Sequence, residues 1–243
     1  MKKEVQVLPD AESLARAAAG IFSAAAAEGV ADRGRCAVAL SGGRTPQALF
    51  RLLGREYGAR LPWELVQLFW ADERVVPPED EQSNFRTVRE ELLARIALPP
   101  GNVHRIHGEL PPTGAAAAYE AELRNYFGAK ALPDFDLILL GIGTDGHTAS
   151  LFPGAAVLKE RHRWAVPLYN PATANWRVTL TLPVLNNASC VVFLVSGPEK
   201  AAIVEAILGR GKGGEYPAGM VKPAKGRLVW LLDNEAASAL EAS

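Results

Sequence analysis

The sequence has few cysteines and no excess of charge of either sign, and both absences narrow what it can be. Its two cysteines, Cys36 and Cys190, lie inside apolar runs, which predicts buried free thiols and no disulfide framework. Lysine and arginine number 26 against 27 aspartates and glutamates, a net charge of -1. Because nucleic acids and membrane surfaces attract a basic excess, we expect neither as a partner, although local cations can still surround a small anion.

The sequence also lacks a long hydrophobic run and a recognisable targeting segment. Its apolar stretches fall well short of the ~18 residues that a membrane span needs. The first residues, MKKEVQVLPD, place Glu4, Pro9 and Asp10 where a signal peptide would carry an apolar run. We therefore expect a soluble protein of the cytoplasm.

No repeat, low-complexity tract or linker divides the chain. Of its 243 residues, 49% are hydrophobic and 22% are charged, which is typical of a globular protein and excludes disordered, collagen-like and coiled-coil classes. At about 100 to 200 residues per domain, this length fits one large domain or two small ones. We predict a single domain over residues 1–243 and, since no heptad seam or large apolar helix face stands out, a monomer.

Apolar runs that are typical of buried strands alternate with helical patterns. The runs are CAVAL (36–40), VQLFW (66–70), FDLILL (135–140), CVVFLV (190–195) and RLVWLL (227–232). The helical stretches cover 10–28, 45–58, 83–96, 113–126, 198–208 and 235–240. RWAVPLY (163–169) and RVTLTL (177–182) follow one another without a helix between them. This order predicts an α/β fold, with a mostly parallel sheet, helices on both faces and a few antiparallel strands added.

The segment SGGRTP follows the strand at 36–40 and opens a helix. Ligands of open α/β sheets bind beyond such strand ends, and the first N–H groups of a helix attract a phosphate. The candidates for anion binding are therefore Ser41, Gly42, Gly43, Arg44 and Thr45. A tight turn without a ligand is the alternative, and the Gly-Lys-Ser/Thr of a Walker motif is missing.

The loop after the strand at 135–140 carries Asp145-Gly146-His147. Its glycines spell G-x-G-x-x-G, but the loop lies past the middle of the chain, and Asp145 would repel a pyrophosphate. A histidine on such a loop can act as a general base near neutral pH, so His147 is the candidate base. Asp145 or Asp72 could orient its ring. The alternative is a histidine that only caps a short helix.

Three cations stand at the other strand ends. Arg74 belongs to ADER after the strand at 66–70, Arg177 opens the strand at 177–182, and Lys200 lies in the first turn of a helix, where it opposes the helix dipole. A local ion pair with its acidic neighbours is the alternative for Arg74. Taken together with the glycine-rich helix start, the cations indicate a phosphorylated small molecule as the ligand.

The sequence supports neither a metal site nor a serine nucleophile. His104 and His107 form H-x-x-H without a third ligand, which favours packing or surface roles, and we expect no metal and no cofactor. Ser41 lies in A-L-S-G-G and so lacks the G-x-S-x-G of a serine nucleophile elbow.

The ordered motifs SGGRTP, WADERVVP followed by SNF, GIGTDGHTASLFPG, RVTLT and SGPEK resemble the 6-phosphogluconolactonase family over roughly positions 38 to 232. The resemblance implies a Rossmann-like α/β fold shared with glucosamine-6-phosphate deaminase and ribose-5-phosphate isomerase. It also implies hydrolysis of 6-phospho-D-glucono-1,5-lactone to 6-phospho-D-gluconate in the oxidative pentose phosphate pathway, without metal or nucleotide. The implied catalytic residues are His147 and Asp145, and the implied substrate-binding residues are Ser41, Gly42, Gly43, Arg44, Thr45, Asp72, Arg74, Gly143, Arg177 and Lys200.

Two alternatives accompany this interpretation. The deaminases share the SGG-x-TP and G-x-DGH loops, but they typically continue HIAFNEP where this chain reads HTASLFP from His147. A non-catalytic sugar-phosphate sensor on the same fold is the other. Position 44 is often serine in relatives, so we assign no essential role to the Arg44 side chain. N–H groups of the loop near Gly143 are the candidate oxyanion donors.

Overall fold

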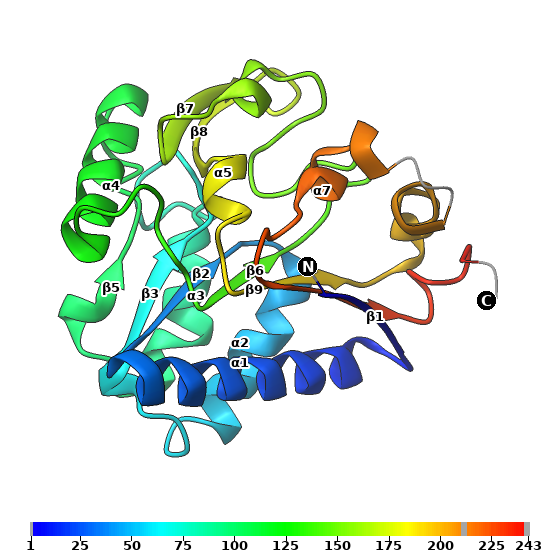
Figure 1. Cartoon of the computed structure of the whole chain (residues 1–243), viewed down its shortest axis with the longest axis horizontal. Helices are drawn as coiled ribbons and strands as arrows, with labels where there is room; N and C mark the ends of the chain where they lie inside the picture. The colour runs from blue at the N-terminus through cyan, green and yellow to red at the C-terminus, as the bar shows by residue number, and fades with distance from the viewer. Residues whose placement is uncertain (1, 210–212, 241–243) are drawn as a thin grey trace.

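A seven-stranded parallel sheet runs through the molecule (Figure 1). The computed structural model describes residues 2–209 and 213–240. The strand order is β1 (Lys2–Leu8), β10 (Arg227–Asp233), β9 (Cys190–Val195), β6 (Leu137–Leu140), β2 (Cys36–Leu40), β3 (Val66–Trp70) and β5 (Val103–His104), and all neighbouring pairs are parallel. The order reverses between β2 and β6, and such a switch point is where ligands of open α/β sheets bind.

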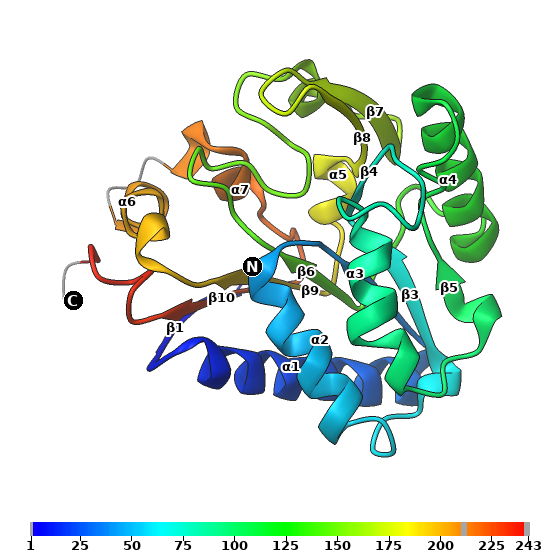
Figure 2. The same ribbon diagram turned by 180° about the vertical axis from the view of Figure 1, so that it is seen from behind.

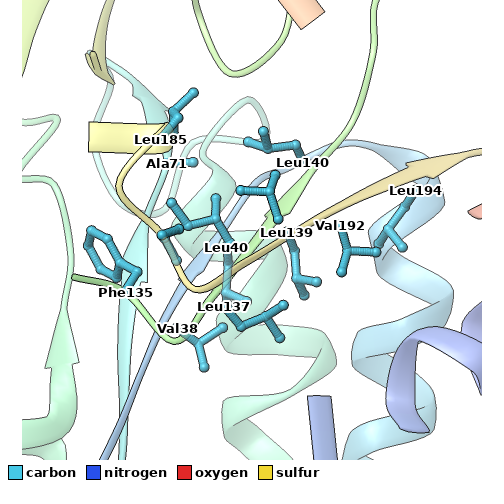
Figure 3. Packing of buried hydrophobic residues seen from close by; sticks show 14 of the residues in the cluster. Val38, Leu40, Ala71, Phe135, Leu137, Leu139, Leu140, Leu185, Val192 and Leu194 are labelled. Atoms are coloured by element: carbon cyan, nitrogen blue, oxygen red, sulfur yellow. The ribbon is translucent and has the colours of Figure 1, made fainter. Parts of the chain in front are cut away.

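The strands beside the switch point are buried on both faces. Every position of β2, β6 and β9 is buried, which explains why these segments are apolar without alternation. Figure 3 shows Val38 and Leu40 of β2 packing near Leu137 and Leu139 of β6. This layer is the centre of the hydrophobic core.

Helices cover both faces of the sheet, so the expected fold class is confirmed. α1 and α2 lie along one side, and α4 and α5 lie on the other (Figures 1 and 2). The helices are α1 (Ala11–Arg33), α2 (Arg44–Glu56), α3 (Asn84–Glu91), α4 (Pro112–Phe127), α5 (Leu182–Leu185), α6 (Ala201–Val204) and α7 (Pro217–Met220).

The antiparallel strands form a sheet of their own. β4 (Asp72–Arg74), β8 (Asn175–Leu180) and β7 (Ala165–Asn170) pair antiparallel in that order. We expected this hairpin to extend the main sheet. It pairs with β4 because the chain bends at Ala71, whose N–H donates to Leu40 of β2 at 2.8 Å and whose carbonyl accepts from Leu180 at 2.8 Å.

Of the helices expected near the two ends of the chain, the N-terminal one forms and the C-terminal one does not. α1 begins after Asp10, whose carboxylate accepts from the N–H of Ser13 at 2.7 Å, as an N-cap should. The expected helix at 235–240 is wrong, because residues 235–239 form turns and residue 240 a bend. The Asp233 carboxylate accepts from the N–H of Ala236 at 2.7 Å, as an N-cap would, but no helix continues from it. β1 was not predicted, since its charged and half-exposed residues do not resemble a buried strand.

The length and apolar composition of α1 raise the question of whether this helix spans a membrane. Among the described residues it is the one helix that is long and apolar enough, by length and composition, to cross a membrane. Its buried side chains, Leu14 and Phe22 among them, belong to the core, and the helix contacts β2, β9 and β10. Its apolar composition is therefore accounted for by packing on the sheet.

Candidate active site

The carboxyl ends of β2, β4, β6 and β9 surround a cleft of about 480 Å³. All of the site residues predicted from the sequence line this cleft except Asp145. Asp145 lies in an adjoining groove and contacts His147, which faces both spaces. The fold thus brings together groups that the sequence separates by more than a hundred positions.

The glycine-rich loop leaves the start of α2 open. Gly43 precedes the helix with a φ of 109°, and no side chain caps the first N–H groups. A Cβ added at Gly42 would lie 1.8 Å from Oδ1 of Asn84, so the packing there requires glycine. The Arg44 side chain is 92% exposed and pairs with Glu199 at 3.3 Å, which leaves the backbone of the loop facing the cleft.

Arg74 and Arg177 stand opposite one another across β4 and β8. Arg177 is only 8% exposed, and its Nε donates to Asn175 Oδ1 at 3.2 Å. Neither guanidinium has a carboxylate partner within the described part of the chain, and that of Arg74 donates instead to the backbone carbonyl of Gln82, so the local ion pair considered for Arg74 is wrong. Burial lowers the pKa of Arg177 and the charge of Arg74 lowers it further, but a guanidinium remains protonated in proteins. Two adjacent positive charges are therefore available to an anion.

The acidic neighbours of Arg74 are committed elsewhere. The Glu73 carboxylate accepts from the backbone N–H groups of Arg74, Asn84 and Phe85, each at 2.7 Å, and so caps α3. Burial raises the pKa of Glu73 to about 7, even though those three amides favour its charged form. The Asp72 carboxylate lines the cleft and accepts from Ser150 Oγ at 2.7 Å.

Asp145 is the carboxylate that orients His147. Its Oδ1 lies 2.6 Å from His147 Nδ1 and accepts from the backbone N–H of His147 at 3.1 Å. Burial raises the pKa of Asp145, but the backbone hydrogen bond and the charge of His147 outweigh it, so the net shift is downward. The contact occupies Nδ1 and leaves Nε2 as the nitrogen available to a water. Residues 147–152 form no helix, so a capping role for His147 is wrong.

Gly143 lines the cleft and packs against His147. A Cβ there would lie 2.1 Å from His147 Nδ1, so glycine is needed to admit the ring. Its N–H, however, donates to the carbonyl of His147 at 2.9 Å. The Gly143 amide is therefore not free to stabilise an oxyanion in this structure.

Lys200 and several residues that were not predicted complete the cleft. Lys200 ends the turn Pro198–Lys200 and has no ion pair within residues 2–209 and 213–240. Asn84, Ser196 and Glu199 also line the cleft. Asn84 and Ser196 stand in the motifs SNF and SGPEK, which was the only signal that could have found them.

The remaining histidines and both cysteines stand apart from this cleft. His104 stacks on Phe69 at 4.3 Å and contacts Glu122 and Gln67, which is a packing role. Among the described residues, no three histidine, cysteine or acidic side chains are arranged to hold a metal ion. Cys36 and Cys190 are buried free thiols, as predicted.

The ends of the parallel strands supply an open helix start and an Asp–His pair, and the small antiparallel sheet supplies two arginines without a carboxylate partner among the described residues. This arrangement suits a small anion next to a histidine. The family model for glucosamine-6-phosphate isomerases and 6-phosphogluconolactonase matches residues 9–230, and the chain belongs to this family. The resemblance seen in the motifs is thereby confirmed.

Within the family, this chain is similar to proteins that are named 6-phosphogluconolactonase. The 6-phosphogluconolactonase of Homo sapiens is 41% identical over 211 residues, covering 86% of this chain and 82% of the relative. That of Synechocystis is 38% identical over 240 residues, covering 97% and 98%. The solved 6-phosphogluconolactonase of Thermotoga maritima matches with a TM-score of 0.83 at 31% identity, covering 96% and 100%. A monomeric glucosamine-6-phosphate deaminase, at 23% identity and a TM-score of 0.80 over 97% and 99%, shares the fold alone.

Proposed function

We propose that the protein is a 6-phosphogluconolactonase that hydrolyses 6-phospho-D-glucono-1,5-lactone to 6-phospho-D-gluconate, the lactone step of the oxidative pentose phosphate pathway. The observation that carries the proposal is the Asp145–His147 pair in contact with a cleft that also holds three cations and an open helix start. The names of the relatives support the same reaction.

The phosphate binds at the start of α2. Backbone N–H groups of residues 42–45 receive it, and Arg74, Arg177 and Lys200 supply positive charge. Ser41 has a buried hydroxyl without a partner among the described residues, which suits a donor to a ligand oxygen. Asp72 accepts from a sugar hydroxyl with a lone pair that its protein partners leave unused.

His147 performs the chemistry as a general base. Nε2 removes a proton from a water as the water oxygen attacks the lactone carbonyl carbon, while the Asp145 carboxylate stabilises the resulting imidazolium. Collapse of the tetrahedral intermediate breaks the bond between the carbonyl carbon and the ring oxygen, which takes the proton back from His147. The product acid then loses a proton to solvent. No group in this scheme requires a metal or a nucleotide.

A pair of assays tests the function. Fresh 6-phosphogluconolactone, corrected for spontaneous hydrolysis, should be turned over, and glucosamine-6-phosphate should release no ammonia. Ammonia release alone would establish the deaminase alternative, and binding without either reaction would establish the sensor.

Activity should also survive EDTA and dialysis. A loss that only a divalent ion restores would contradict water activation by His147.

The base is tested by His147→Ala. General base catalysis contributes roughly a hundredfold to ten-thousandfold, so kcat should fall at least about a hundredfold with the fold intact. His107→Ala is the matched control, because His107 is exposed, lies outside the cleft and pairs through its ring with Glu109. Near-normal turnover by His147→Ala would refute the assignment.

The other properties expected from the sequence remain part of this proposal. They are a single domain over residues 1–243, a monomeric state, a cytoplasmic location, and a small sugar-phosphate lactone as the only ligand, without nucleic acid or membrane. Size-exclusion chromatography with light scattering tests the oligomeric state.

A further inference from the structure

The residues that follow His147 form a strained turn. The N–H of Leu151 donates to the carbonyl of Thr148 at 2.9 Å, which closes a turn over residues 148–151. Ala149 occupies the left-handed region with a φ of 47°. This conformation is unfavourable for a residue with a side chain, and such strain persists only where the surroundings hold it.

Buried hydroxyl groups hold this turn on both sides of Ala149. Thr148 Oγ1 donates to the carbonyl of Gly141 at 2.8 Å. Ser150 is 0% exposed, and its N–H donates to Thr179 Oγ1 at 3.2 Å. Its Oγ donates to Asp72 Oδ2 at 2.7 Å. The last bond joins the loop of the base to a carboxylate of the small sheet, 78 positions away in sequence.

Asp72 is well placed to act as the anchor. It is 5% exposed and lines the cleft, and Asn84 Nδ2 donates to its carbonyl at 2.9 Å. The Ser150 contact therefore links the turn directly to a residue that lines the cleft.

We propose that Ser150 is a positioning residue for catalysis, which fixes the backbone that carries His147 by donating to Asp72. The inference rests on the proposed function, since it assigns His147 as the base. Gly143 holds the carbonyl of His147, and the turn holds the residues after it, so the imidazole is fixed from both directions. Asp72 also faces the cleft. In this proposal the same carboxylate therefore contacts the substrate and fixes the loop that carries His147.

Ser150→Ala tests the inference by its effects on kcat and KM separately. A misplacement of about 1 Å in a catalytic group can lower the rate ~100-fold, so we expect kcat to fall roughly tenfold to a hundredfold. KM should change by less than about threefold, because the proposed phosphate contacts lie on other loops. Thr181→Val is the matched control, since Thr181 is 0% exposed and donates to the carbonyl of Arg163 at 2.8 Å outside the cleft.

The readout separates positioning from a structural role. A structural role would lower the melting temperature of Ser150→Ala and leave the kcat of the folded protein unchanged, as we expect for Thr181→Val. If Ser150→Ala does not fold, Ser150→Cys keeps the volume and supplies only a weak donor, and the same kcat loss is expected.

A loss of less than about fivefold in kcat, or one confined to KM, would overturn the inference. An inactive wild-type protein would instead refute the proposed function, so the two failures are distinguishable.

Discussion

The most informative perturbation of this site is Arg177→Met, which removes a buried charge and keeps much of the side-chain volume. Arg177 is 8% exposed, lies opposite Arg74, and has no carboxylate partner in the described chain. A hydrogen bond to a charged group is worth about 1.5 to 3 kcal/mol. At about 1.4 kcal/mol per decade, loss of one phosphate contact should lower kcat/KM roughly tenfold to a hundredfold.

The same substitution should leave the fold as stable or make it more stable. Burial and the charge of Arg74 both lower the pKa of Arg177, which means that folding disfavours its charged form. Removing that charge relieves the penalty, at the cost of weak hydrogen bonds to Asn175 and Thr173. We therefore expect an unchanged or raised melting temperature alongside the loss of activity, a combination typical of residues kept for function.

The assay compares two substrates and two variants. Arg177→Met should lose activity on the phosphorylated lactone and change little on unphosphorylated gluconolactone, whose kcat is already low because remote binding energy is missing. Inorganic phosphate should raise the melting temperature of the wild type more than that of the variant. Arg51→Met, on an exposed part of α2, controls for the loss of one positive charge. Equal losses on both substrates would show that Arg177 serves the carbonyl or the fold, and the phosphate assignment would fall.

Two further predictions concern the glycine loop and the base. Gly42→Ala places a methyl group 1.8 Å from Asn84 Oδ1 and should destabilise the protein by about 1 to 3 kcal/mol in chemical denaturation, whereas Gly20→Ala, with nothing within 4 Å, should stabilise it by about 0.5 to 1 kcal/mol. Asp145→Asn should lower kcat by about tenfold or more, because an amide donor favours the wrong tautomer of His147. The folded-state pKa of Asp145 is lowered, so its stabilising effect is present above about pH 4 and lost at lower pH. The difference in melting temperature between wild type and Asp145→Asn should shrink as the pH falls below about 4, and a constant difference would contradict this account.

The sequence predicted what depends on local pattern. The continuous apolar runs of β2, β6 and β9 identified the buried strands, and the residues at their carboxyl ends proved to share one cleft. That step needed only the rule that parallel strands end at the same edge. It could not tell which carboxylate orients His147, because the choice between Asp145 and Asp72 depends on the path of the loop.

The features that the sequence did not predict also depend on how separate segments of the chain meet. Alternation identifies a half-exposed strand but not its partner, so the hairpin of β7 and β8 was placed on the wrong sheet. Hydrogen-bond use is also invisible in sequence, so the prediction of oxyanion donors among the loop N–H groups near Gly143 could not exclude the Gly143 amide, which donates to the carbonyl of His147. Ser150 is a further case, since a serine in a loop gives no sign that a buried carboxylate lies opposite it.

The small sheet is what gives this α/β fold its particular site. The open helix start of α2 and the turn of Lys200 belong to the main sheet and could hold an anion without further help. Arg74 and Arg177 come from the second sheet, which is joined to the first through the hydrogen bonds of Ala71. The same sheet supplies Asp72, which holds the turn after His147. In the proposed mechanism, charge for the phosphate and the position of His147 both depend on one bend in the chain, so a change that shifts this sheet should impair binding and turnover together.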